Sequence, residues 1–165
     1  QAGGGWAYDV SELGYKCNLT DIAAAFGIEQ LSHLDEWHLR RKALIEGYLK
    51  GLALIDGIIL PSHTDGAVHA WHLNVVRIIP ELWTISRNTL IEKINEKGVG
   101  TSVHYIPVHM HSYYSKKYGY LPEDYPVAKH ISETAITLPL YPGLNEQQFQ
   151  YIIQSLNELW LDYKK

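Results

Sequence analysis

One short segment of the sequence places a lysine and an asparagine two residues apart, just ahead of an expected helix. Lys16 and Asn18 stand before Thr20 and Asp21, a pair suited to capping and charging a helix N-terminus. A cation and an amide at such a position suit an anion such as a phosphate, because the first N–H groups of a helix have no partner within it. The plainer interpretation, which the residues alone favour, is a buried helix preceded by a solvated lysine.

Histidines form the second group of chemically capable residues. His104 stands at the end of an expected strand, and the loop after it, which contains a proline and carries His109 and His111, could gather the three. No cysteine or acidic cluster completes a zinc site with them. His69 and His72 would share one face of a helix, but their stretch alternates like a strand and so predicts opposite faces. We therefore expect no bound metal.

Other catalytic signatures are missing from the sequence. It contains no nucleophile motif, phosphate-binding loop or paired-carboxylate site. Residue types alone therefore predict an α/β domain whose polar region is residues 104–111.

Composition narrows the class of protein. The 165 residues, of which 46% are hydrophobic and 19% charged, suffice for one globular domain. The net charge of -4 argues against nucleic-acid binding. The single Cys17 excludes an internal disulfide and fits the cytoplasm, and no apolar run is long enough to span a bilayer. Because the chain opens with Gln1 and its only methionine is Met110, we expect a piece of a longer protein.

The helix expected over residues 22–28 is apolar on every side, whereas a surface helix shows a single apolar stripe. We expect it to lie outside the compact domain, covered by a partner subunit or by a missing part of the same chain. A capping box formed by Ser32 and Asp35 then predicts a long amphipathic helix that ends near Gly51.

The remaining elements alternate between strands and helices. Strands are expected over residues 56–60, 69–79, 99–105 and 135–138. Ser86 should cap a helix that stops at Gly98, a short helix is expected over residues 127–132, and Asn145 with Gln148 should cap the last one. This order predicts an α/β sandwich with a small sheet covered on one face.

Several motifs, found in order along nearly the whole chain, resemble those of one family. They are Gly14-Tyr15-Lys16-Cys17-Asn18-Leu19-Thr20-Asp21-Ile22, His69-Ala70-Trp71-His72-Leu73, Gly98-Val99-Gly100-Thr101, His104-Tyr105 with Pro107 and His109, and Leu138-Pro139-Leu140-Tyr141-Pro142. The sequence is identified as a member of the DegT/DnrJ/StrS family of pyridoxal-phosphate sugar aminotransferases. It most resembles the branch with G-Y-K-Y-N, which includes the enzyme that makes UDP-4-amino-4-deoxy-L-arabinose. Cys17 departs from the usual tyrosine.

The resemblance implies a fold and a division of the chain. The fold is α/β, the C-terminal small domain of an aspartate-aminotransferase-like (type I PLP transferase) fold, with a small, mostly antiparallel sheet covered by helices and preceded by a dimer-interface helix. Residues 1–32 would be the tail of the large domain with that helix, and residues 33–165 the small domain. In the family, the lysine that binds the cofactor as a Schiff base lies upstream. No catalytic residue is therefore expected in this chain, which should be inactive alone.

The resemblance also implies binding roles, residue by residue. Lys16 and Asn18 occupy positions that reach across a dimer interface to the phosphate of the neighbouring subunit's pyridoxal phosphate, and either could make the contact. His104, Tyr105 and His109 match the segment that lines the sugar-nucleotide side of the cleft. A packed strand end with satisfied imidazoles is the alternative for these three residues.

The function implied for the complete protein is conversion of a nucleotide-linked keto-sugar to an amino-sugar, with glutamate as donor, for polysaccharide or cell-envelope glycan biosynthesis. It would be a cytoplasmic homodimer with the active site at the subunit interface, and no nucleic-acid or membrane partner is expected. The alternative is a non-catalytic binding or dimerisation module that retains the fold without the lysine. An upstream S-x-x-x-x-K segment followed by a Gly-rich turn would favour the enzyme.

Overall fold

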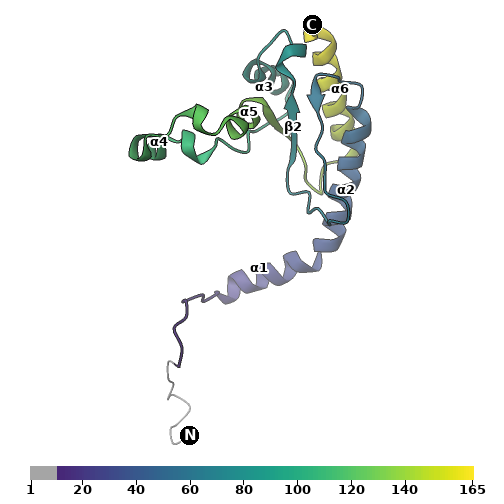
Figure 1. The fold of residues 1–165 in the computed structure, drawn as a ribbon. Helices are drawn as coiled ribbons and strands as arrows, with labels where there is room; N and C mark the ends of the chain where they lie inside the picture. Colours follow the sequence, from purple (N-terminus) through teal and green to yellow (C-terminus); the bar gives the residue numbers. More distant parts are fainter. Residues whose placement is uncertain (1–10) are drawn as a thin grey trace, which may run out of the picture. The chain divides into compact units, whose positions relative to one another are not determined.

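The computed structural model describes residues 11–165, and the chain divides into two compact units with the boundary between Leu34 and Asp35. The first unit contains α1 (Asp21–Ser32), shown in Figure 1. As predicted, Thr20 caps this helix, because its hydroxyl oxygen accepts a hydrogen bond from the backbone N–H of Ala23 at 3.2 Å. No side chain of α1 is buried, so its apolar residues remain uncovered.

The second unit is built on a three-stranded antiparallel sheet with the strand order β1-β2-β3. β1 (Ile58–Ile59) is one edge, β2 (Asn74–Ile78) is the centre, and β3 (Ala135–Leu138) lies on the other side of β2. The sequence predicted the bounds of β3 and a longer version of β1.

Alternation along β2 separates the two faces of the sheet. Val76 and Ile78 are buried, whereas Val75, which precedes Val76, and Arg77, which lies between the two buried residues, are half-buried. Val75 pairs with Thr137 on β3, and residues directly opposite each other in an antiparallel pair point to the same face. One face therefore enters the core, and the other carries Val75, Arg77 and Thr137.

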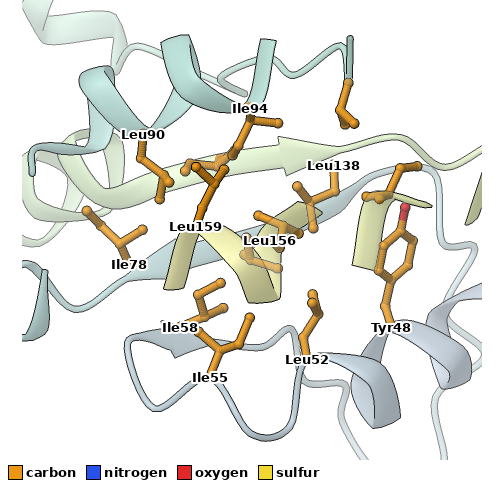
Figure 2. Close-up of a cluster of buried hydrophobic side chains, with 14 of the residues drawn as sticks. Tyr48, Leu52, Ile55, Ile58, Ile78, Leu90, Ile94, Leu138, Leu156 and Leu159 are labelled. Carbon is orange, nitrogen blue, oxygen red and sulfur yellow. The ribbon is translucent and has the colours of Figure 1, made fainter. Parts of the chain in front are cut away.

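Three helices cover the core face: α2 (Leu34–Gly51), α3 (Arg87–Glu96) and α6 (Glu146–Tyr163). Their apolar side chains, those of the sheet and those of the segment between α2 and β1 form one hydrophobic cluster, shown in Figure 2. The labelled members are Tyr48, Leu52, Ile55, Ile58, Ile78, Leu90, Ile94, Leu138, Leu156 and Leu159. Ser86 caps α3, and Asn145 with Gln148 forms a capping box at α6, both as predicted.

Short helices occupy the chain between β2 and β3. The 3-10 turn η1 (Pro80–Leu82) precedes α3, and η2 (Val108–Met110), α4 (Ser112–Tyr118), η3 (Pro122–Asp124) and α5 (Pro126–Thr134) follow it. The helix predicted over residues 127–132 is thus confirmed as α5, while α4 was not predicted. α5 packs against β2, and Figure 1 shows α4 farther from the sheet.

The strand expected over residues 69–79 begins only at Asn74, so the prediction was wrong for residues 69–73. Trp71 has a left-handed φ of 47°, and its N–H donates to Nδ1 of His69 at 2.9 Å. This local hydrogen bond takes the stretch out of the extended conformation. His69 and His72 therefore lie in a loop, where strand alternation does not apply.

The strand expected over residues 99–105 is reduced to a single bridge between Ser102 and Thr137. The backbone N–H of Thr101 donates to the side-chain oxygen of Asn95 at 3.2 Å and is not available to the sheet.

The prediction of a capping box at Ser32 was also wrong. The Ser32 hydroxyl donates to the carbonyl oxygen of Glu29 at 2.7 Å, and α2 begins at Leu34.

Candidate functional site

Lys16 and Asn18 lie in the non-helical segment before α1, and both are exposed. Thr20 and Asp21 then place a cap and a carboxylate at the first turn. Within residues 11–165 neither Lys16 nor Asn18 has a hydrogen-bond or ion-pair partner, so their N–H groups remain available to a ligand. An ammonium, an amide donor and a helix N-terminus together fit a phosphate dianion, which is the chemical group expected here.

His104 and Tyr105 are brought together in the second unit. Their ring centroids are 4.6 Å apart and the planes are nearly perpendicular, at 89°. Nδ1 of His104 shares a hydrogen bond of 2.8 Å with the hydroxyl of the buried Thr137. Tyr105 is 70% exposed. The sheet thus holds the imidazole in place, while the phenol beside it presents an open surface for a ligand.

His109 has a different environment. Its side chain is buried, Nε2 lies 3.4 Å from the carbonyl oxygen of Pro122, and its ring centroid is 4.7 Å from that of Tyr125. These contacts tie η2 to η3. A ligand contact by His109 therefore stays a prediction, and the structure shows a packing contact at this position.

Arg87 connects α3 to the start of β3. Its Nη1 donates to the carbonyl oxygen of Ala135 at 2.7 Å. Burial lowers the pKa of the guanidinium, and the carboxylate of Glu133 opposes that effect. This arginine is thus engaged by the protein's own backbone.

Two polar residues near His104 were not singled out from the sequence. Thr137 holds His104, and Arg77 lies diagonally across the β2–β3 pair from Thr137. The signal that could have found them was the alternation of two facing strands, which places Thr137 and Arg77 on the same face. Sequence alone did not give the pairing register that brings them together.

Residues 11–165 contain neither a cluster of metal ligands nor a membrane-spanning helix. In this range there is no group of three or more His, Cys, Asp or Glu side chains arranged to hold a metal ion. No helix in the same range is both long enough and apolar enough to cross a membrane.

Solved structures similar to this chain define the class of protein first. Spr1654 of Streptococcus pneumoniae, named as a sugar aminotransferase and solved in its PLP form, shares 31% identity with a TM-score of 0.82, covering 95% of this chain and 40% of that chain. DesV of S. venezuelae shares 31% identity with a TM-score of 0.81, covering 95% of this chain and 41% of that one. The fold is accordingly that of the C-terminal small domain of type I PLP aminotransferases.

The sequence then identifies the family. Residues 2–157 match the DegT/DnrJ/EryC1/StrS aminotransferase family, and the chain belongs to it. The spore coat polysaccharide biosynthesis protein SpsC of Bacillus subtilis (strain 168) is 36% identical over 157 residues, or 94% of this chain and 40% of that protein. The chain thus spans about two fifths of the length of the curated relative it matches. Pyridoxal phosphate is the cofactor of this family, and similar structures include PLP and PMP forms of Spr1654.

Proposed function

We propose that the complete protein is a PLP-dependent aminotransferase that converts a nucleotide-linked keto-sugar to an amino-sugar, with glutamate as the amino donor. Its product would serve polysaccharide or cell-envelope glycan biosynthesis in the cytoplasm. The observation that carries this proposal is the family match over residues 2–157, joined by PLP and PMP forms among the similar structures.

The first role proposed for this chain is to hold the cofactor phosphate. Lys16 and Asn18 are exposed and lie ahead of the capped N-terminus of α1. Lys16 supplies a cationic donor to the phosphate, and Asn18 supplies a neutral amide donor. When bound, pyridoxal phosphate supplies an electron sink for amino transfer, and the covalent contact comes from a lysine upstream of this chain.

The second role is to bind the sugar nucleotide. Tyr105 offers an exposed ring, and His104 offers an imidazole whose position is set by Thr137. His109 would support this surface by fixing η2 against η3. Residues 33–165 would thereby act as the small domain, and residues 1–32 as the tail of the large domain.

The proposed assembly is a homodimer in which α1 contributes to the interface and Lys16 serves the neighbouring subunit's cofactor. The apolar side chains of α1 are exposed on all sides of the helix, which a packed neighbour would cover. This arrangement predicts that two different inactive subunits can restore one another.

The test mixes full-length Lys16→Ala subunits with full-length subunits that lack the cofactor-binding lysine. A charge-assisted contact contributes about 1.5 to 3 kcal/mol, so Lys16→Ala alone should weaken cofactor retention by roughly ten- to a hundred-fold. If Lys16 acts across the interface, each heterodimer holds one site with both defects and one with neither, and 2-oxoglutarate production from glutamate and keto-sugar returns on mixing. If it acts within its own subunit, every heterodimer site has one defect.

Lys50→Ala provides the matched control, because Lys50 is an exposed lysine in the last turn of α2. It should behave as the unmodified protein in the same mixture. Verified heterodimers that regain no activity would remove the role of Lys16 across the interface. A full-length protein that forms no 2-oxoglutarate with any nucleotide keto-sugar would contradict the aminotransferase proposal itself.

A further inference from the structure

Arg77 is a half-buried arginine on the sheet face that points away from the hydrophobic core. Its neighbours along β2, Val76 and Ile78, point into the core, so its own side chain projects to the opposite side. Among the described residues 11–165, its guanidinium forms neither a hydrogen bond nor an ion pair. A half-buried guanidinium that lacks a protein partner is a ready receptor for an anion.

Strand register relates Arg77 to Thr137, the residue that holds His104. Arg77 pairs with Ala135 and Val75 with Thr137, so Arg77 and Thr137 are diagonal neighbours on one face. Diagonal neighbours in an antiparallel pair lie about 7 to 8 Å apart, within reach of a long side chain. Thr137 in turn holds His104 through the 2.8 Å hydrogen bond. Two relations therefore connect the three residues: strand register places Arg77 diagonal to Thr137, and a hydrogen bond joins Thr137 to His104.

A hollow begins two residues before Arg77, and its lining includes neither Arg77 nor Thr137 nor His104. Val75, two residues before Arg77 on the same face, lines a hollow of about 350 Å³ together with Leu73 and residues of the preceding loop, among them Trp71 and His72. This volume is at the lower end of the range for small-molecule sites.

Arg87 shows why Arg77 differs from a structural arginine. Arg87 lies near the same end of β3, yet it donates to the carbonyl oxygen of Ala135 and has the carboxylate of Glu133 nearby. Arg77 pairs with the same Ala135 through its backbone only. Within the part of the chain that the structure describes, one of these two arginines fixes α3, and the five N–H donors of the other have no partner.

We propose that Arg77 binds an oxyanion of a substrate: the diphosphate of the nucleotide-sugar or the carboxylate of the amino-acid donor. Both groups match the planar fork of a guanidinium in a bidentate contact. This proposal rests on the proposed function for the identity of the substrates. The assignment of Arg77 as an anion receptor comes from the residue's own position and from the absence of a hydrogen-bond or ion-pair partner among the described residues.

The experiment uses the full-length protein with Arg77→Gln, Arg77→Lys and the matched charge control Lys50→Gln. Thermal unfolding is followed without ligand and with UDP, dTDP or glutamate, and KM is measured separately for sugar nucleotide and donor. Without ligand, Arg77→Gln should unfold at nearly the same temperature as the unmodified protein, because no hydrogen bond or ion pair within residues 11–165 is lost. With the anion that Arg77 binds, the ligand-induced stabilisation should disappear.

The two sources of the anion give different results. A loss of UDP or dTDP stabilisation, with KM for the sugar nucleotide raised about ten- to a hundred-fold, identifies the diphosphate. A loss of the stabilisation by glutamate, with the KM for glutamate raised by a similar factor, identifies the carboxylate. Arg77→Lys should recover only part of the affinity, because it keeps the charge and loses the bidentate fork.

The proposal is overturned if Arg77→Gln leaves every ligand-induced shift and both KM values equal to those of Lys50→Gln. It is also overturned if Arg77→Gln lowers the unfolding temperature without ligand and leaves ligand binding intact, since that result assigns a structural role. Nucleotide-induced stabilisation does not require turnover. An inactive protein that loses this stabilisation on Arg77→Gln would therefore contradict the proposed reaction and support the receptor.

Discussion

Thr137→Val removes the hydroxyl that holds His104 and keeps the shape of the side chain, so it tests how the candidate substrate surface is positioned. The hydrogen bond is 2.8 Å long, Thr137 is buried, and His104 is half-buried. A neutral hydrogen bond of this kind contributes about 0.5 to 1.5 kcal/mol net. For a chain of this size, 1 kcal/mol corresponds to about 2 to 4 °C in the unfolding midpoint. We therefore expect Thr137→Val to lower the midpoint by a few degrees.

The imidazole itself gives the more specific readout. A fixed hydrogen bond at Nδ1 favours one tautomer and one orientation of the ring, so His104 should show one set of imidazole ¹⁵N signals in the unmodified chain. Thr137→Val should release the ring, shift those signals towards a mixture of tautomers and weaken the contact with Tyr105 seen in nuclear Overhauser spectra. Thr137→Ser keeps the hydroxyl and should preserve both the stability and the signals. If the valine variant matches the unmodified chain in both measurements, Thr137 does not position His104.

Two further substitutions test the core. Burial raises the pKa of Tyr48, with the neighbouring Tyr141 adding to the effect, so the folded state favours the neutral phenol and the free energy of unfolding should fall as pH rises above about 10. Tyr48→Phe removes the 2.8 Å hydrogen bond to the carbonyl oxygen of Pro139 and should lower the free energy of unfolding by about 0.5 to 1.5 kcal/mol at pH 8. Urea unfolding should show that this difference from the unmodified protein shrinks above pH 10. A difference independent of pH would contradict this reasoning. Asn74 is fully buried, and within residues 11–165 neither side-chain polar atom has a partner, so Asn74→Leu should raise the free energy of unfolding by about 1 to 3 kcal/mol. Asn157→Leu is the control and should lower the free energy of unfolding, because the Asn157 amide donates to the carbonyl oxygens of Gly51 and Ile153. Equal changes in the free energy of unfolding for Asn74→Leu and Asn157→Leu would refute this distinction between a partnered and an unpartnered asparagine.

Elements with local signals could be predicted from the sequence. Thr20, Ser86 and Asn145 each cap a helix by accepting a hydrogen bond from the backbone N–H three residues later, and a cap of this type depends only on neighbouring residues. The strand at 135–138 was similarly clear, because an apolar stretch there ends at Pro139. These elements fixed the order of helices and strands, and hence the class of fold.

Features that depend on long-range contacts could not be predicted. Whether residues 99–105 form a strand depends on Asn95, whose side chain captures the N–H of Thr101. The burial of His109 depends on Pro122 and Tyr125, more than ten residues away along the chain. For the same reason the candidate role of Arg77 depends on the register between β2 and β3, and that of His104 depends on the bridge between Ser102 and Thr137.

The composition of α1 connects cofactor binding to association. The helix has 12 residues, a length at which an isolated helix is marginal in water. Ile22, Phe26, Ile28 and Leu31 are each at least 68% exposed, and burying four side chains of this size would contribute on the order of 6 to 12 kcal/mol before the entropy of association is subtracted. That range is comparable with the whole stability of a typical domain. In the proposed dimer, the neighbour that covers α1 would therefore also fix the segment that carries Lys16. Because such coupling is reciprocal, binding of the cofactor phosphate at Lys16 would strengthen association of the subunits by the same factor by which association strengthens cofactor binding.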